Sequence, residues 1–313
     1  HCQNLYALGH CDIIVVRSRR TTDAPQSEFL RKYRPKVVFN LSAALAERPD
    51  AVFVTNPTSL HVPTALAAIR AGAHVFIEKP ISHRMAGVDR LIAEARRRRR
   101  IIYVGYHFRH HPQLKVAHRL IVAGALGRPL WARFVTAEYL PGCHSWEDYR
   151  KGYAARRDLG GGVVLTQSHD LDTALWLFGS PRRVWASVRN SGTLGIDVDD
   201  TAELVYACRG CPLVSIHLDY LARPPIKRLT VIGTTGRLEW DYHAGTLRRI
   251  DLKGQEKRFP LPRGFQRNDM YVRELKDFLR CIRSRRQPES NGRSGAAVLA
   301  MALSAKEASR RGR

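Results

Sequence analysis

The chain has 313 residues, and hydrophobic residues make up 44% of them. This length and composition allow two globular domains of ordinary size and exclude an intrinsically disordered chain. No apolar run reaches the roughly 18 residues that a membrane-spanning helix needs, and the first residues lack the order of a signal peptide. We therefore expect a soluble, cytoplasmic protein without a membrane partner.

The chain is strongly basic, because 52 lysines and arginines outnumber 28 acidic residues and give a formal charge of +24. Such a charge attracts phosphate groups, so nucleic acid is one candidate partner. The basic residues are spread along the whole chain, however, whereas nucleic-acid-binding proteins gather them on one element beside aromatic side chains. We therefore expect no nucleic-acid partner; a phosphate-bearing cofactor, an anionic substrate or a general arginine excess also fits the charge.

Six cysteines are scattered through the chain, a usage typical of free thiols in a reducing compartment. Two of them form the segment Cys208-Arg209-Gly210-Cys211, a spacing that also occurs in zinc sites. A structural zinc ion needs four ligands, and no second pair with suitable spacing accompanies these two. We expect no metal site and interpret the segment as a turn between two strands.

Residues 12–108 alternate short apolar runs with helical patterns, which predicts a parallel sheet with crossover helices. One helical face contains Val62, Leu66 and Ile69 and ends before Gly72; a second helix follows Ser82, which we expect to be its N-cap. The expected strands are Ile13 to Val16, Val37 to Phe39, Ala51 to Thr55, His74 to Ile77 and Ile101 to Gly105.

From about residue 130 the strands follow one another without long helices, as in an antiparallel meander. Val214, Ile216 and Leu218 alternate with polar residues, which predicts a strand with one buried face. Helices are expected at about 114–123 and 169–178, and a third, which contains Leu275, leans back on the first half. We thus predict a doubly wound α/β domain at 1–108 and an α+β domain with a large, mostly antiparallel open sheet at 109–313.

The sharpest local motif is Glu78-Lys79-Pro80, directly after the expected strand His74 to Ile77. Proline ends the strand, so Lys79 should lie at the carboxyl edge of the parallel sheet, where such domains bind ligands. A lysine there can exchange a proton with a substrate hydroxyl, provided that burial or neighbouring groups disfavour its charged form. The tripeptide by itself is more typical of a solvated turn, and its position after the strand is what favours catalysis.

Several motifs together give the chain a family resemblance. In the first half they are Thr55-Asn56-Pro57-Thr58 with His61 and Pro63, Glu78-Lys79-Pro80, and Gly105-Tyr106 with Arg109 and Pro112. In the second half they are Trp146 to Tyr149, Tyr153 to Arg157, and Gly160 to Gly162 followed by Ser168 to Asp172. In order and spacing this set resembles the Gfo/Idh/MocA oxidoreductase family over nearly the whole chain.

The resemblance implies that a Rossmann-like first domain binds NAD or NADP while hydride passes between the nicotinamide and a carbinol of a sugar, cyclitol or nucleotide sugar. Lys79 would transfer the proton, and His169 would relay it or orient the hydroxyl, although a histidine at a helix start is also commonly satisfied by backbone. Asp172, one turn along the same helix, would fix the His169 ring or bind sugar hydroxyls. The resemblance also implies a homo-oligomer, a dimer or tetramer, built through the C-terminal sheet.

The expected cofactor site combines several segments. Thr55, Asn56, Pro57, His61 and Glu78 would line it, together with Lys79. At the end of the strand Ile13 to Val16 stand Ser18, Arg19 and Arg20, where arginine would meet the 2′-phosphate of NADP; this slightly favours NADP over NAD.

Three residues of the second half are candidates for ligand contact. Trp146 and Tyr153 would stack on a sugar ring or on the base of a nucleotide sugar, although aromatic residues at this spacing are more often part of a core. Arg156 would reach a cofactor phosphate, or is a surface charge.

Two features depart from the family pattern. Many members carry an aspartate shortly before the histidine, where Thr166 and Gln167 stand here, so proton relay would depend on Lys79 and His169. The chain also begins without the first strand and the Gly-x-Gly-x-x-Gly turn that presents backbone amides to a pyrophosphate. We interpret it as truncated at its N-terminus and expect a gap in the first sheet where that strand would lie.

A second class of function remains open, namely a non-catalytic protein that keeps the fold and binds a sugar or nucleotide. The missing glycine turn and Thr166 favour this alternative, whereas Lys79 and His169 favour the dehydrogenase. The dehydrogenase hypothesis requires that the ammonium group of Lys79 and the imidazole of His169 converge on one site.

Overall fold

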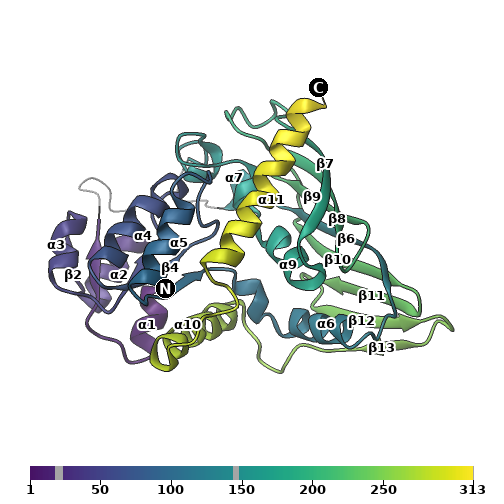
Figure 1. Cartoon of the computed structure of the whole chain (residues 1–313), viewed down its shortest axis with the longest axis horizontal. Coiled ribbons are helices and arrows are strands. Elements are labelled where there is room, and N and C mark those ends of the chain that lie inside the picture. The colour runs from purple at the N-terminus through teal and green to yellow at the C-terminus, as the bar shows by residue number, and fades with distance from the viewer. Residues whose placement is uncertain (18–23, 144–147, 313) are drawn as a thin grey trace.

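The structure is a computed structural model that describes residues 1–17, 24–143 and 148–312. The parallel strands with their helices lie on one side of the molecule, and a broad sheet lies on the other (Figure 1). The chain thus builds the predicted combination of a Rossmann-like α/β half and a half with a large, mostly antiparallel open sheet.

The first half alternates helices and strands in the predicted order. All five expected strands are present, and their ends lie within one residue of the predicted ends. The elements are α1 (Cys2–Ala7), β1 (Ile14–Val16), α2 (Ala24–Tyr33), β2 (Lys36–Val38), α3 (Leu41–Ala46), β3 (Ala51–Val54), η1 (Thr58–Leu60), α4 (His61–Arg70), β4 (His74–Ile77), α5 (Val88–Arg97) and β5 (Ile102–Val104).

The parallel strands form two separate sheets. One contains β1 and β2, and the other contains β3, β4 and β5 in this order. No strand of the described residues joins them, so the predicted gap is present. In the second sheet Val75, Phe76 and Ile77 of β4 are fully buried, because β4 lies between β3 and β5.

The predicted start of α5 is wrong. The helix begins at Val88 with Gly87 as its N-cap, whereas Ser82 lies in the preceding loop, where its hydroxyl accepts a hydrogen bond from the Arg84 amide at 3.4 Å. Gly87 has a φ of +83°, and a side chain there would meet Val62 at 3.0 Å. The close approach of α4 therefore decides where α5 can begin, a constraint that the local sequence does not show.

The second half contains one sheet of eight strands in the order β13-β12-β11-β10-β6-β9-β8-β7. Its elements are η2 (His107–His110), α6 (Pro112–Val122), β6 (Pro129–Ala137), α7 (Leu140–Cys143), η3 (Tyr153–Ala155), α8 (Val163–Thr166), α9 (His169–Phe178), β7 (Pro181–Arg189), β8 (Thr201–Cys208), β9 (Val214–Asp219), β10 (Ile226–Gly233), β11 (Gly236–Asp241), β12 (Thr246–Asp251) and β13 (Glu256–Arg258).

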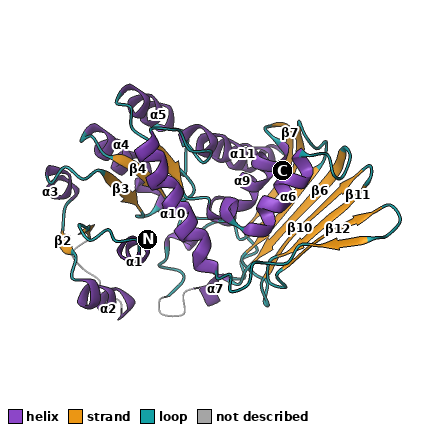
Figure 2. Ribbon diagram, turned by 90° about the horizontal axis from the view of Figure 1, so that it is seen from below, coloured by secondary structure: helices purple, strands orange, loops and turns teal. Residues whose placement is uncertain are grey.

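Only β6 and β9 pair in parallel within this sheet. The predicted alternation is confirmed in β9, where Val214, Ile216 and Leu218 are fully buried and the residues between them are partly exposed. Helices α6, α9 and α11 lie on one side of the sheet (Figure 2). The buried face of each strand therefore packs against these helices.

Two long helices, α10 (Arg267–Ser284) and α11 (Gly292–Arg311), end the chain. Phe278 of α10 and Cys281 form a buried cluster with Phe76, Ile101 and Tyr103 of the parallel sheet, which confirms that this helix leans back on the first half. Helix α11 packs mainly against β7 and also contacts α9, α5 and β5. The two helices thus connect both halves of the molecule.

The segment Cys208 to Cys211 is the predicted turn, because it connects the antiparallel strands β8 and β9. Both thiols are free and buried, and the Cys208 amide donates a hydrogen bond to the Cys211 carbonyl at 3.0 Å. Among the described residues no group of three or more His, Cys, Asp or Glu side chains could hold a metal ion. Within the same ranges, none of the helices has the length and apolar character to cross a membrane.

Candidate active site

Lys79 lies at the carboxyl end of β4, as expected from the proline that follows it. The Glu78 amide still pairs with the Val54 carbonyl of β3 at 2.9 Å, and the chain leaves the sheet directly afterwards. The partly buried Lys79 side chain donates a hydrogen bond from Nζ to the Thr166 carbonyl oxygen at 2.6 Å. This contact joins the parallel sheet to the segment that precedes α9.

The charge state of Lys79 differs from the expected one. Burial would lower the pKa of this lysine, but the nearby acidic groups Glu78 and Glu138, together with the hydroxyls of Tyr153 and Tyr271, raise it above its ordinary value of 10.5. The condition that the sequence analysis attached to proton exchange, a disfavoured charged form of Lys79, is therefore not met. At neutral pH the side chain is an ammonium group, which is a proton donor.

His169 is the first residue of α9 and is 6% exposed. Burial lowers its pKa well below the ordinary value, and the positive charges of Lys79, Lys227 and Arg267, as well as His107, act in the same direction. Its Nδ1 has no hydrogen-bond partner among the described residues. His169 is thus a neutral imidazole with one unpaired nitrogen. It lies close enough to Lys79 for the ammonium charge to lower its pKa.

A second histidine lies beside this ring, and the sequence analysis missed it. The His107 ring centroid is 4.3 Å from that of His169 and 4.3 Å from that of Tyr271 on α10. Burial lowers the pKa of His107 to about 3. Its position directly after the Gly105-Tyr106 motif was the available signal, but only the fold shows that η2 carries it to α9.

Asp172, expected to fix the His169 ring or to bind sugar hydroxyls, forms an ion pair with Arg109. Its two carboxylate oxygens accept hydrogen bonds from Arg109 Nε at 2.8 Å and Nη2 at 2.7 Å, and both side chains are buried. Burial alone would lower the pKa of Arg109, but the surrounding anions, Asp172 above all, raise it. This bidentate pair anchors α9 to η2.

A second buried ion pair, also missed from the sequence, holds the same helix against the sheet. Lys227 Nζ of β10 lies 3.0 Å from Asp170 Oδ1 and donates to Thr136 Oγ1 at 2.8 Å. The same ammonium group lies 4.5 Å from the centre of the Phe108 ring. Asp170 and Asp172 therefore fix the first turn of α9, which carries His169, from two directions.

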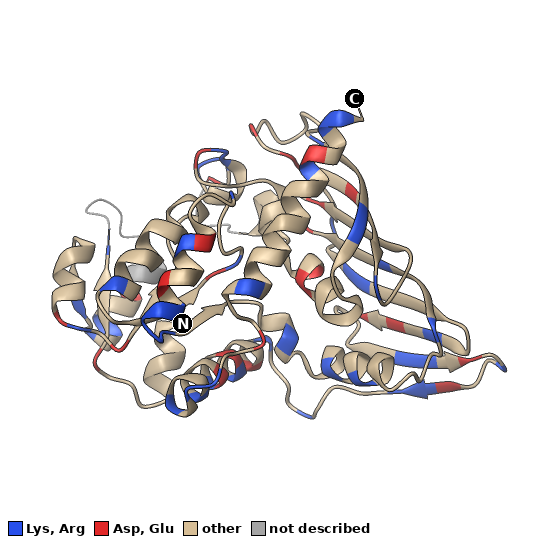
Figure 3. Ribbon diagram, in the orientation of Figure 1, with Lys and Arg blue, Asp and Glu red and all other residues tan. Residues whose placement is uncertain are grey.

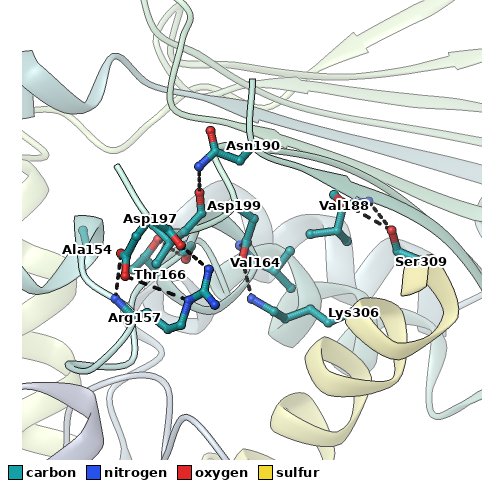
Figure 4. A network of polar contacts seen from close by, with 12 residues as sticks. Ala154, Arg157, Val164, Thr166, Val188, Asn190, Asp197, Asp199, Lys306 and Ser309 are labelled. Carbon is teal, nitrogen blue, oxygen red and sulfur yellow. Dashed lines mark hydrogen bonds and ion pairs between the residues drawn. The ribbon is translucent and has the colours of Figure 1, made fainter. Parts of the chain in front are cut away.

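The glycine turn before α8 packs so closely that side chains are excluded. A Cβ atom at Gly161 would lie 2.4 Å from the Tyr153 carbonyl oxygen, and Gly162 has a φ of +105°. Asp199 accepts a hydrogen bond from the Val164 amide at 3.1 Å and pairs with Lys306 of α11 (Figure 4). This network fixes α8, whose last residue, Thr166, binds Lys79 through its carbonyl group.

The expected cofactor segment Thr55 to Pro57 lies at the carboxyl end of β3, next to Lys79 at the end of β4. The Asn56 side chain donates from Nδ2 to Thr64 Oγ1 at 2.9 Å, while its Oδ1 atom is buried without a partner among the described residues. An unpaired amide oxygen at the edge where nicotinamides bind fits the carboxamide group of that ring.

His61 is buried, and its expected direct contact with the cofactor is not supported. Its Nδ1 lies 2.8 Å from the Pro80 carbonyl oxygen, and its Nε2 lies 2.9 Å from the Asn56 carbonyl oxygen. Neither ring nitrogen remains free. His61 therefore holds the loops after β3 and β4 together, a positioning role that the motif did not reveal.

The remaining candidates have different surroundings. Glu78 Oε1 lies 2.5 Å from His1 Nε2, and Glu78 Oε2 accepts from the Lys79 amide at 3.2 Å. Arg156 is exposed and its Nε donates to Asp158 at 3.0 Å, which identifies it as a surface charge in this structure and does not support the expected phosphate contact. Ser18, Arg19, Arg20 and Trp146 lie outside the described residues.

Taken together, the parallel edge and the side chains around Lys79 fit the nicotinamide end of a dinucleotide. Asn56 and Glu78 of the first half would hold that end beside Lys79. His169, which belongs to the second half, would face it from the other side. Fold and site thus define an oxidoreductase of the class that binds NAD through a Rossmann domain.

Family comparisons specify this class further. Residues 3–106 match the family described as "Oxidoreductase family, NAD-binding Rossmann fold", and residues 114–239 match the "GFO/IDH/MocA C-terminal domain". The chain belongs to the Gfo/Idh/MocA family of oxidoreductases.

Individual relatives are similar over most of their length. The chain is 29% identical to the myo-inositol 2-dehydrogenase of Thermotoga maritima, over 82% of this chain and 77% of the relative. It is 27% identical to the 1,5-anhydro-D-fructose reductase of Ensifer adhaerens, over 84% and 78%. The solved structure of UDP-N-acetylglucosamine 3-dehydrogenase GnnA from Acidithiobacillus ferrooxidans has a TM-score of 0.80 at 24% identity and covers 98% of this chain and 92% of that chain.

Proposed function

We propose that the protein transfers hydride between a nicotinamide cofactor and a carbinol carbon of a sugar, cyclitol or nucleotide sugar. The observation that carries this proposal is the Lys79 ammonium group at the carboxyl edge of the parallel sheet, close enough to the buried His169 to affect its pKa. The named relatives support the substrate class, because they act on an anhydrosugar, an inositol and a nucleotide sugar.

Proton transfer in this proposal belongs to Lys79. The bound nicotinamide supplies or accepts the hydride. In the reductive direction the ammonium group donates its proton to the oxygen of the substrate carbonyl, and in the oxidative direction the neutral amine accepts the hydroxyl proton. Because Glu78 and Glu138 favour the ammonium form, the resting site is prepared for reduction. The pKa of Lys79 would fall beside the positive charge of an oxidised nicotinamide, and the neutral amine formed in this way assists the oxidative direction.

His169 is proposed to orient the reacting hydroxyl. A neutral imidazole offers one hydrogen-bond donor and one acceptor, and the buried Nδ1 atom has no hydrogen-bond partner among the described residues. The Asp170–Lys227 and Asp172–Arg109 ion pairs hold the helix that carries it. Tyr153 contributes to the raised pKa of Lys79 and therefore lies near it, which supports the proposal that its ring contacts the sugar.

For the cofactor we propose NADP in preference to NAD. The support is the sequence Arg17-Ser18-Arg19-Arg20 after β1, since guanidinium groups bind a 2′-phosphate. Michaelis constants for the two cofactors measured with the same substrate test this preference. A lower Michaelis constant for NAD than for NADP would overturn the proposal.

The decisive test of the reaction is the variant Lys79→Met, with Lys253→Met in an exposed turn as the matched control. Turnover is followed by NAD(P)H absorbance with myo-inositol, 1,5-anhydrofructose and UDP-N-acetylglucosamine as probes. Loss of the proton donor should lower kcat by about 10²- to 10⁴-fold, while cofactor affinity and the control remain within about twofold.

Two results would contradict the proposal. An unchanged kcat in Lys79→Met would remove this residue from proton transfer. If the protein bound a cofactor or sugar but turned over none of a broad panel of sugars and cyclitols, the non-catalytic alternative would replace the dehydrogenase.

We also propose that copies of the chain associate through the outer face of the eight-stranded sheet. Trp185 of β7 is 53% exposed and Trp131 of β6 is 38% exposed, and large exposed aromatic side chains are typical of interfaces. Light scattering should show a dimer or tetramer, and Trp185→Glu should shift it to smaller species. A monomer at all concentrations would exclude this interface.

The free cysteines support our expectation of a reducing compartment.

A further inference from the structure

A large basic cavity lies at the edge of the parallel sheet opposite to Lys79. It has a volume of about 1130 Å³ and includes His74, the first residue of β4, and Ile102, the first residue of β5. Because Lys79 follows the other end of β4, the cavity and the candidate active site lie at opposite ends of the same strand. Most of the polar residues in its wall are arginines: Arg96, Arg98, Arg99, Arg100, Arg283, Arg285 and Arg293.

Most of these arginines have no acidic partner. Arg98 binds Glu94, but within the described ranges no ion pair involves the other six, and no Asp or Glu side chain lines the cavity. Some arginines elsewhere are paired, such as Arg248, which lies 2.7 Å from Glu239 and 3.1 Å from Glu256, and others, such as Arg119 and Arg128, are in no ion pair among the described residues. Lysine and arginine are spread over the whole molecule (Figure 3), so the unusual feature of the cavity is that several arginines without an acidic partner line one hollow.

Helix stability explains some of these positions and not others. Helices α5 and α10 end beside the cavity, and basic residues near a helix C-terminus stabilise it, which accounts for Arg96 and Arg283. Arg293, however, stands in the first turn of α11, where a positive charge opposes the helix dipole and no acidic residue is present. A bound anion would relieve this unfavourable interaction.

One further observation indicates a donor without an acceptor. The Arg100 Nη1 atom lies 3.5 Å from His74 Nε2, and the Arg100 Nε atom is buried without a partner among the described residues. A buried donor without a partner is unfavourable, and a bound anion would supply the acceptor.

We propose that this cavity binds a compact anion that carries several phosphate groups. Planar guanidinium groups bind phosphate oxygens in pairs, and several in one hollow match several phosphates. The apolar wall consists of isoleucines and one alanine, and no Phe, Tyr or Trp is among its described lining residues, so the stacking surfaces typical of single-stranded nucleic-acid sites are missing. The confined volume also favours a small molecule over a polymer.

Calorimetric titration of the whole protein with tripolyphosphate tests the proposal. The variant Arg96→Gln/Arg285→Gln/Arg293→Gln removes three cavity charges, and Arg119→Gln/Arg128→Gln/Arg182→Gln removes three exposed charges elsewhere; each lowers the formal charge from +24 to +21. We expect saturable binding that weakens about tenfold or more in the cavity variant and less than about twofold in the control. The single variant Arg293→Gln should also weaken binding while it keeps or raises the melting temperature.

Each other outcome would overturn the proposal. Equal weakening in both triple variants would show that the general charge excess attracts the anion. Competition by NAD or NADP would place tripolyphosphate at the cofactor edge. Binding of single-stranded RNA without binding of tripolyphosphate would identify a polymer site. If the cavity variant does not fold, unchanged affinity in Arg293→Gln is the contradicting result.

Discussion

Glu274 of α10 is a buried carboxyl group whose surroundings decide its charge. It is 1% exposed, and neither side-chain oxygen has a hydrogen-bond partner among the described residues. Burial raises its pKa well above the ordinary value of 4.5, and the negative charges of Glu78, Asp172 and Asp277 act in the same direction. The neutral form of Glu274 is therefore favoured in the folded protein above pH 4.5, where the unfolded chain ionises.

The variant Glu274→Gln should stabilise the protein increasingly as the pH rises. The folded wild-type protein binds one proton more than the unfolded chain between pH 4.5 and the raised pKa, so its free energy of unfolding falls across this window. Glutamine cannot ionise, so the free energy of unfolding of the variant does not fall for this reason. Melting temperatures at pH 5, 6, 7 and 8 measure the difference, and Glu28→Gln in exposed α2 controls for the loss of one negative charge. A difference that shrinks with rising pH would contradict a protonated Glu274.

At the scale of elements, the position of His169 depends on contacts before and around α9. The glycine turn, α8 and the two ion pairs of Asp170 and Asp172 form a continuous support. The Val163 amide donates to the Asp199 carbonyl at 2.8 Å, so α8 begins against a loop that follows β7 (Figure 4). Disturbing the turn should therefore displace the carbonyl group of Thr166 that binds Lys79.

The substitution Gly161→Ala should destabilise the protein and lower its activity. The added Cβ would lie 2.4 Å from the Tyr153 carbonyl oxygen and 2.6 Å from that of Ala154, and backbone atoms cannot move away cheaply. We expect a loss of about 2 to 4 kcal/mol in the free energy of unfolding, measured with urea. Gly142→Ala is the matched control, because its nearest contact would be an ordinary 3.8 Å. Equal stability of the two variants would show that the turn tolerates a side chain.

For the whole molecule, buried histidines predict sensitivity to acid. Burial lowers the pKa of His107 to about 3 and those of His110 and His111 to about 4. Unfolding exposes these rings, which then bind protons when the pH lies below their ordinary pKa of 6.5. The free energy of unfolding should therefore decrease as the pH falls from 6.5 to about 4.

The variant His111→Phe tests the origin of this sensitivity. The ring packs among aromatic side chains, 5.3 Å from Trp240 and 5.4 Å from Phe265 between centroids, so phenylalanine should fit. Relative to wild type, the variant should gain about 2 kcal/mol at pH 5 compared with pH 7, as measured by urea unfolding. His243→Gln, at an exposed position, is the control. A pH-independent difference between the variant and wild type would exclude His111 as a source.

The sequence by itself determined the strands of the first half and the position of Lys79. Apolar periodicity and proline act within a few residues, so the strands were predicted to within one residue and Lys79 to the end of β4. The order and spacing of motifs also determined the family, since such a set is specific even when each piece is common. The N-cap of α5 was predicted wrongly because the packing of α4 against Gly87 overrides the local signal.

Only the tertiary structure decided the charges and partners in the site. Lys79 binds a carbonyl 87 positions away, and Arg109 binds Asp172 over 63 positions, so neither contact is visible in a local pattern. Burial and neighbouring charges then set the pKa values of Lys79, His107 and Glu274. The arginine cavity is formed likewise from segments near residues 74, 100 and 290. These properties arise from distances in space, which a single sequence does not contain until the chain has folded.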